Sequence, residues 1–219
     1  MPEGARDAVL AAIARATDRV RDADPAAAHD ALARSYRRDA EVNPEARLAR
    51  LVERLEDYGV RVTRTAEAGL PATIARWVAE RGVRRWVVPR GLPEHWLSEA
   101  RGITAVGDDT DPRGLDAVDA VVTSCAVAVA ETGSIVLDAG RGQGRRAATL
   151  VPDVHLCVVP ASLVVDLVPE AVAWTAEAVD AGRPLTWISG PSATSDIELV
   201  RVAGVHGPRT LAVLLVEDA

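Results

Sequence analysis

The chain has 219 residues, a length typical of one compact α/β domain, and a formal net charge of −7. The negative charge disfavours nucleic-acid binding, and so does the shortage of aromatic side chains, with no Phe among them. All 25 basic residues are Arg, so a P-loop lysine, a lysine Schiff base and a lysine general base are excluded.

Hydropathy and cysteine content predict a cytoplasmic protein. No stretch approaches the roughly 20 apolar residues that cross a bilayer, and the first residues lack the pattern of a signal peptide. Cys125 and Cys157 lie in apolar runs, where a thiol most often packs as a small hydrophobic group. The acidic run Asp108, Asp109 and Asp111 indicates a solvated turn rather than a metal site, so we expect no metal.

The N-terminal part of the sequence is predicted to be helical. Apolar residues recur at spacings of three and four over residues 5–17, which predicts an amphipathic helix. We assign residues 1–40 to an N-terminal helical appendage and residues 41–219 to an α/β domain. That domain opens on a helix with Asn43 as its N-cap and Pro44 at the first helical position.

Strand and helix patterns alternate through the rest of the chain. Several predicted strands are apolar on both faces, as buried parallel strands require. The pattern therefore predicts an α/β fold with a mostly parallel central sheet covered by helices on both faces. The expected strands are 60–65, 85–89, 103–106, 119–123, 134–137, 154–159, 185–189 and 210–216, and the expected helices open at Pro71 and near Pro169.

The segment from Trp187 to Glu198 is the most unusual part of the sequence. Gly190 and Pro191 turn the chain after a strand, and the spacing from Ser195 to Glu198 is that of a capping box, which predicts a helix N-terminus. Free amides and the helix dipole at such a place favour a phosphate or a carboxylate. The acidic side chains already present favour the alternative, a well-capped turn without a ligand. The ligand-binding candidates are Ser189, Gly190, Ser192, Thr194, Asp196 and Glu198.

Two further clusters contain the candidate catalytic groups. His206 lies on a turn flanked by glycines, where an imidazole can act as a proton shuttle near neutral pH, although a loop histidine can equally be structural. Glu131 is the best carboxylate candidate, because its small neighbours permit close approach and offer hydroxyl donors. The ligand-binding candidates beside these two groups are Thr132, Gly133, Gly207 and Arg209.

A glycine-rich stretch at residues 140–144 precedes a pair of arginines. Arg145 and Arg146 could clamp an anionic ligand there, although the glycines match neither a dinucleotide fingerprint nor a P-loop. Asp153 and His155 then lie on the same side of a strand start, where they could form a structural hydrogen-bonded pair.

Together these motifs resemble one known family. The segments ETGSIVL (131–137), RR with LVPDVH (145–155), ISGPSATSDIE (188–198) and GVHGPR (204–209) are similar to the lactate-utilisation C proteins (LutC/YkgG, the LUD domain) in wording, order and approximate spacing. The resemblance covers about residues 40–217. Four linked motifs in order are far more specific than any one of them.

The resemblance implies a fold similar to the NagB/RpiA/CoA-transferase group, which agrees with the alternation of strands and helices. It also implies a part in oxidising L-lactate to pyruvate, together with partner subunits that carry iron–sulfur clusters. Two cysteines cannot supply the four thiolates of a cluster, so we expect no cofactor in this chain and iron–sulfur clusters on the partners.

Two other functions stay open on the residues alone. One is a stand-alone enzyme of the same fold that acts on a CoA-linked or phosphorylated carboxylate, with Glu131 attacking an activated acyl group. The other is a ligand-sensing or assembly module without chemistry of its own. We expect the site residues, from Glu131 to Arg209, to converge on a single polar hollow at one end of the sheet.

Overall fold

The structure falls into two units, Met1–Arg37 and Arg38–Ala219. The computed structural model describes residues 3–21, 24–40, 42–195, 201–204 and 206–218. The first unit holds α1 (Glu3–Arg21) and α2 (Pro25–Asp30), and α1 confirms the predicted N-terminal helix.

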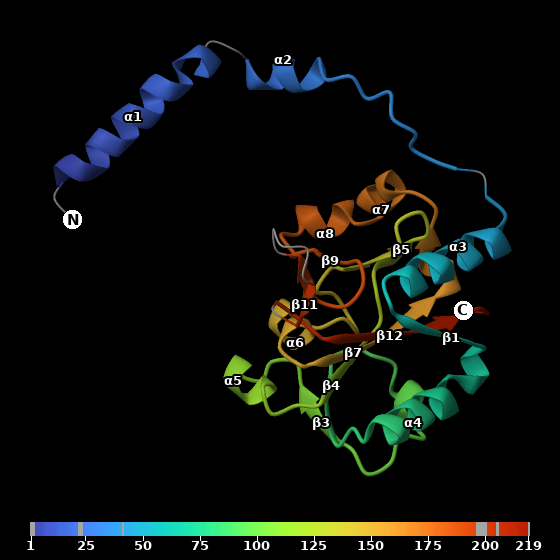
Figure 1. Ribbon diagram of the computed structural model, residues 1–219. Coiled ribbons are helices and arrows are strands. Elements are labelled where there is room, and N and C mark those ends of the chain that lie inside the picture. The colour runs from blue at the N-terminus through green and yellow to red at the C-terminus, as the bar shows by residue number, and fades with distance from the viewer. Residues whose placement is uncertain (1–2, 22–23, 41, 196–200, 205, 219) are drawn as a thin grey trace. The chain divides into compact units, whose positions relative to one another are not determined.

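A six-stranded sheet forms the centre of the second unit (Figure 1). All of its neighbouring strands pair in parallel, which confirms the predicted parallel sheet. In spatial order its strands are β1 (Arg61–Thr65), β12 (Thr210–Val216), β7 (Val154–Pro160), β4 (Ala120–Thr123), β2 (Arg85–Val88) and β3 (Thr104–Gly107).

Helices cover both faces of this sheet, as predicted. Odd-numbered apolar residues of the central strands β7 and β12 point to one face, and even-numbered ones point to the other. The first face packs against α3 (Pro44–Asp57) through residues such as Leu51, and the second packs against α4 (Leu70–Arg81) through residues such as Ile74 (Figure 1). Burial of each such side chain stabilises the fold by roughly 1.5–3 kcal/mol.

The ends of these two helices follow the sequence signals. The Asn43 side chain accepts a hydrogen bond from the Glu45 amide at 2.9 Å, and Pro44 occupies the first helical position of α3. The helix α4 ends at Gly82, whose φ of +64° is the left-handed conformation that glycine adopts without strain.

A second, smaller sheet lies beside the main one, and the sequence did not indicate it. We expected residues 134–137 and 185–189 in the parallel sheet, and this expectation is wrong. Both segments pair in antiparallel fashion in the second sheet, because a turn of four residues joins β5 to β6, whereas a parallel connection needs a long crossover. In spatial order its strands are β8 (Val164–Val165), β5 (Val127–Val129), β6 (Ser134–Leu137) and β9 (Thr186–Ile188).

The remaining elements are short. The strands β10 (Ala193–Ser195) and β11 (Arg201–Ala203) form an antiparallel pair of their own. Within the described ranges, no helix is long and apolar enough to cross a membrane. The other helices are α5 (Pro112–Leu115), α6 (Arg146–Leu150), α7 (Val168–Trp174) and α8 (Ala176–Asp180), with single 3₁₀ turns η1 (Glu67–Gly69), η2 (Glu94–Leu97) and η3 (Ala161–Leu163).

Candidate functional site

The first motif forms the turn between β5 and β6. Its Gly133 has a φ of +62° and lies so close to α3 that a Cβ atom there would be 2.7 Å from Cβ of Arg54. The hydroxyl of Thr132 donates to that of Ser134 at 2.9 Å, and the Ser134 and Ser189 hydroxyls are 2.8 Å apart. A chain of hydroxyls therefore connects the first motif to the third.

Ser192 joins the third motif to the fourth. Its amide donates to the Pro208 carbonyl at 2.8 Å, and its carbonyl accepts from the Gly204 amide at 2.8 Å. Its hydroxyl accepts from the His206 amide at 3.2 Å. These contacts hold the segment after Ser189 against the turn that precedes β12.

We predicted that a helix begins at Ser195. Ser195 lies in strand β10 and pairs with Arg201 of β11, and residues 196–200, over which that helix would run, lie outside the described residues. Thr194 lies in the same strand, and Asp196 and Glu198 lie outside the described residues.

A small cavity of about 160 Å³ lies where the second, third and fourth motifs meet, and we call it the motif hollow. His155 forms part of its wall and is buried, with its Nε2 atom 2.8 Å from Oγ1 of Thr123. Burial lowers the pKa of His155 to about 4, so its imidazole is neutral at physiological pH. The hollow is lined by Thr149, Leu150, His155, residues 186–192, residues 206–208 and Leu211.

The structure brings five of the predicted site residues together as lining of the motif hollow: Ser189, Gly190, Ser192, His206 and Gly207. Gly190 is required there because its φ is +87° and a Cβ atom would approach Cβ of Tyr58 to 2.7 Å. An uncharged imidazole and serine hydroxyls offer hydrogen bonds to a ligand of a few heavy atoms.

The predicted arginines lie elsewhere. Arg145 donates to the backbone carbonyls of Asp108 and Thr110, which fixes the loop after β3. Arg146 begins α6 and is exposed. Arg209 donates to Asp153 at 3.2 Å, so Asp153 pairs with this arginine and not with His155 as the sequence suggested. The single hollow expected from the sequence is therefore not formed by these residues.

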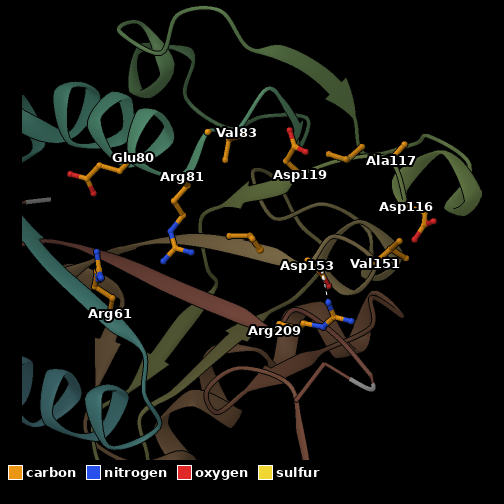
Figure 2. Close-up of a pocket in the computed structure, with 13 residues that line it drawn as sticks. Arg61, Glu80, Arg81, Val83, Asp116, Ala117, Asp119, Val151, Asp153 and Arg209 are labelled. Carbon is orange, nitrogen blue, oxygen red and sulfur yellow. Dashed lines mark hydrogen bonds and ion pairs between the residues drawn. The ribbon is translucent and has the colours of Figure 1, made fainter. Parts of the chain in front are cut away.

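Arg209 instead lines a wide, open cavity of about 920 Å³ at the amino-terminal edge of the main sheet (Figure 2). Asp119 lies on its rim and accepts the Arg84 and Arg85 amides, both at 2.8 Å, which lowers the pKa of its carboxyl group. Residues of three of the four motifs line the motif hollow, so we prefer it to this cavity as the candidate site.

Glu131 lies at the tip of the β5–β6 turn. Its side chain is exposed, and its amide donates to the Asp166 carbonyl at 3.1 Å. Glu131 lines neither the motif hollow nor the open cavity.

Sequence reasoning missed a buried ion pair close to this turn. The Arg47 guanidinium is 2.8 Å from Oδ2 of Asp166, whose side chain is fully buried. Oδ1 of Asp166 has no hydrogen-bond partner within the part of the chain that is described. The signal was an aspartate inside an apolar run, because a carboxylate is rarely buried without a partner.

The fold and the motif geometry agree with a comparison against known families. A family model described as the LUD domain matches residues 48–216, and the chain therefore belongs to the LUD-domain family. Within that family it is grouped with the lactate utilization C proteins. A relative from Deinococcus radiodurans named "Lactate utilization protein C" is 49% identical over 164 residues, which cover 75% of this chain and 76% of the relative.

More distant relatives and one solved structure extend the comparison. A protein of the same name from Bacillus licheniformis is 31% identical over 135 residues, 58% of this chain and 55% of the relative. The crystal structure of a DUF162 family protein from Deinococcus radiodurans superposes with a TM-score of 0.69 at 41% identity, covering 80% of this chain and 99% of that one. The predicted family and its fold are thereby confirmed.

Proposed function

We propose that this chain is a cytoplasmic subunit, without a redox centre of its own, of an iron–sulfur-dependent system that oxidises L-lactate to pyruvate. The observation that carries the proposal is the 49% identity to a protein named for lactate utilization. The family match over residues 48–216 spans all four motifs, so the similarity includes the residues of the motif hollow.

The thiols of the chain support a division of labour with partner subunits. Cys125 and Cys157 are both buried, and they are too few to supply the four thiolates of a cluster. Among the residues that the structure describes, no group of three His, Cys, Asp or Glu side chains is placed to hold a metal ion. The residues present therefore do not fit an iron–sulfur cluster, and the proposal places the clusters on the partners.

The motif hollow is our candidate for the place where a small acid of this pathway binds. Its volume of about 160 Å³ suits a ligand of a few heavy atoms. Its serine hydroxyls and the neutral His155 supply hydrogen bonds to hydroxyl and carboxylate oxygens.

Gly207 offers a way to test this assignment. A Cβ atom there would lie 3.5 Å from Leu150 and 3.5 Å from Ser192, which both line the hollow, so an alanine fits and a larger side chain grows into the space. In a strain that lacks the gene and any paralogue, we expect the wild type and Gly207→Ala to restore growth on L-lactate. We expect Gly207→Leu not to restore it, although growth on pyruvate stays normal.

Two results would count against the proposal. Normal growth of the deletion strain on L-lactate would contradict the proposed role in lactate utilization. Full complementation by a folded Gly207→Leu variant would rule out the motif hollow as the ligand site but leave the role in lactate utilization intact. Co-purification of the tagged chain with iron-containing subunits, measured by iron analysis, tests the partner assignment separately.

The stand-alone acyl-transfer function gains no support from the geometry. Its proposed nucleophile, Glu131, lies on an exposed turn and lines neither cavity described above.

A further inference from the structure

The order of strands in the main sheet creates a crevice at the carboxyl ends of β2 and β4. These two strands are neighbours, but the next strand of this sheet along the chain lies on one side after β2, where it is β3, and on the other side after β4, where it is β7. The segments that leave the two strands therefore diverge. Ligands of open parallel sheets bind at such a switch point, outside the carboxyl ends of the strands.

The glycine-rich loop of residues 138–145 lies across this crevice. The Gly142 amide donates to the Arg90 carbonyl after β2 at 2.9 Å, and the Gly142 carbonyl accepts from the Ser124 amide after β4 at 2.8 Å. Its φ of +73° is a conformation that suits glycine. One residue of the loop thus bridges both diverging segments.

Asp138 stabilises the loop through hydrogen bonds and an ion pair. One of its carboxylate oxygens accepts from the Gly140 amide at 2.8 Å, and the other is 2.8 Å from Nη2 of Arg183. Its own amide donates to the side-chain oxygen of the buried Gln143 at 2.6 Å. The backbone of the loop is therefore held in place before any ligand arrives.

An open cavity of about 640 Å³ lies at this loop, and we call it the switch-point basin. Its volume is within the range of small-molecule sites. Three guanidinium groups line it against one carboxylate, that of Asp108. Arg183 is neutralised by Asp138, whereas Arg90 and Arg141 form no ion pair with any residue described in the structure. The basin is lined by Arg90, Gly91, Asp108, Ala139, Gly140, Arg141 and Arg183.

Gly91 allows Arg141 to cross the rim of the basin. Gly91 has a φ of +84°, and a Cβ atom there would lie 3.1 Å from both Cβ and Nε of Arg141. Any larger residue at position 91 would displace that side chain. The backbone thus holds Arg141 next to the segment that carries Arg90.

We propose that the switch-point basin binds a phosphate-bearing small molecule through Arg90 and Arg141. The planar guanidinium group donates two parallel hydrogen bonds to phosphate oxygens, and neither arginine uses this capacity on any residue that the structure describes. This site lies apart from the motif hollow, so it does not rest on the proposed role in lactate oxidation.

Isothermal titration calorimetry of the full chain at low salt tests the proposal, with pyrophosphate and ADP as phosphate probes and L-lactate and pyruvate as carboxylate probes. We expect at least one phosphate probe to bind more tightly than either carboxylate. The double variant Arg90→Gln/Arg141→Gln should weaken that binding at least about tenfold. A matched variant, Arg61→Gln/Arg81→Gln, removes the same charge from the other open cavity. It should change the affinity for the phosphate probe less than about twofold.

Three outcomes would overturn the proposal: no heat from either phosphate probe at millimolar concentration, preference for the carboxylates, or equal weakening in both double variants. The side chains of Arg90 and Arg141 are exposed, so their replacement leaves the core intact. Far-ultraviolet circular dichroism of each variant confirms that a loss of binding is not a loss of fold. If the basin variant does unfold, protection of the wild-type loop at residues 138–145 from hydrogen exchange by the phosphate probe decides the question instead.

Discussion

Folding removes the imidazole of His155 from water. Burial lowers its pKa to about 4, from 6.5 in an unfolded chain. The folded state therefore favours the neutral ring, and this contribution to stability is complete above pH 6.5. It is lost as the pH falls from about 6.5 towards 4, because only the unfolded state takes up the proton in that window. The full loss is on the order of 3 kcal/mol.

Urea unfolding at pH 7.5, 5.5 and 4.5 measures this dependence. The variant His155→Gln cannot titrate, so we expect it to be less stable than the wild type at pH 7.5 but to lose less stability on acidification. Carboxylates titrate in both proteins and cancel in the comparison. Equal pH dependence in the two proteins would contradict the assignment.

The buried pair of Arg47 and Asp166 makes a second prediction at the residue scale. Replacement of Arg47 by Met leaves the Asp166 carboxylate buried without its cation, and the free energy of unfolding should fall by roughly 3–5 kcal/mol. The exposed pair of Arg54 and Asp57, at 3.3 Å, provides the control, because its loss should cost less than about 1 kcal/mol.

A double-mutant cycle separates the ion pair from packing. Adding Asp166→Leu to Arg47→Met removes the stranded charge and should restore much of the lost stability. If the second substitution restores nothing, the first variant lost packing rather than charge compensation.

At the scale of the element, the turn between β5 and β6 depends on Gly133. Gly133→Ala would place a Cβ atom 2.7 Å from Cβ of Arg54 and 3.0 Å from its carbonyl carbon, in addition to strain from a φ of +62°. The matched variant is Gly182→Ala, where φ is +70° and no atom lies within 4 Å. Both share a conformational cost of roughly 1–2 kcal/mol, and crowding adds roughly 1–3 kcal/mol at Gly133 alone. Chemical denaturation of both variants checks the difference, and equal losses would show that α3 moves aside.

The elements that the sequence predicted well are those with strong local signals. Asn43 and Pro44 fixed the start of α3, and the apolar strands of the parallel sheet were recognisable from their composition. The second sheet was missed because its membership depends on pairing between distant segments. Strand β6 pairs with β9, about fifty residues away, and no local pattern in either segment distinguishes this sheet from the first.

At the scale of the whole molecule, the candidate site was only partly predictable. The hydrogen bonds of Ser192 to the turn before β12 bring two motifs together, as expected from their shared polar character. Arg145 and Arg209 were expected beside them, but Arg145 donates to the loop after β3 and Arg209 pairs with Asp153. A sequence shows that a residue is polar, but it does not show which neighbour becomes its hydrogen-bond or ion-pair partner.

The reactivity of the two thiols can be used to measure global unfolding. Cys157 lies in β7 between β4 and β12, and both thiols belong to the core under α3. A hydrogen bond with Cys157 and burial raise the pKa of Cys125 well above its usual value, so its reactive thiolate is suppressed as well. We expect a thiol reagent to label both residues only through global unfolding, at a rate set by the unfolding equilibrium. The free energy from labelling in native buffer should then equal that from urea unfolding. Rapid labelling of either thiol in native buffer would show instead that this part of the core opens on its own.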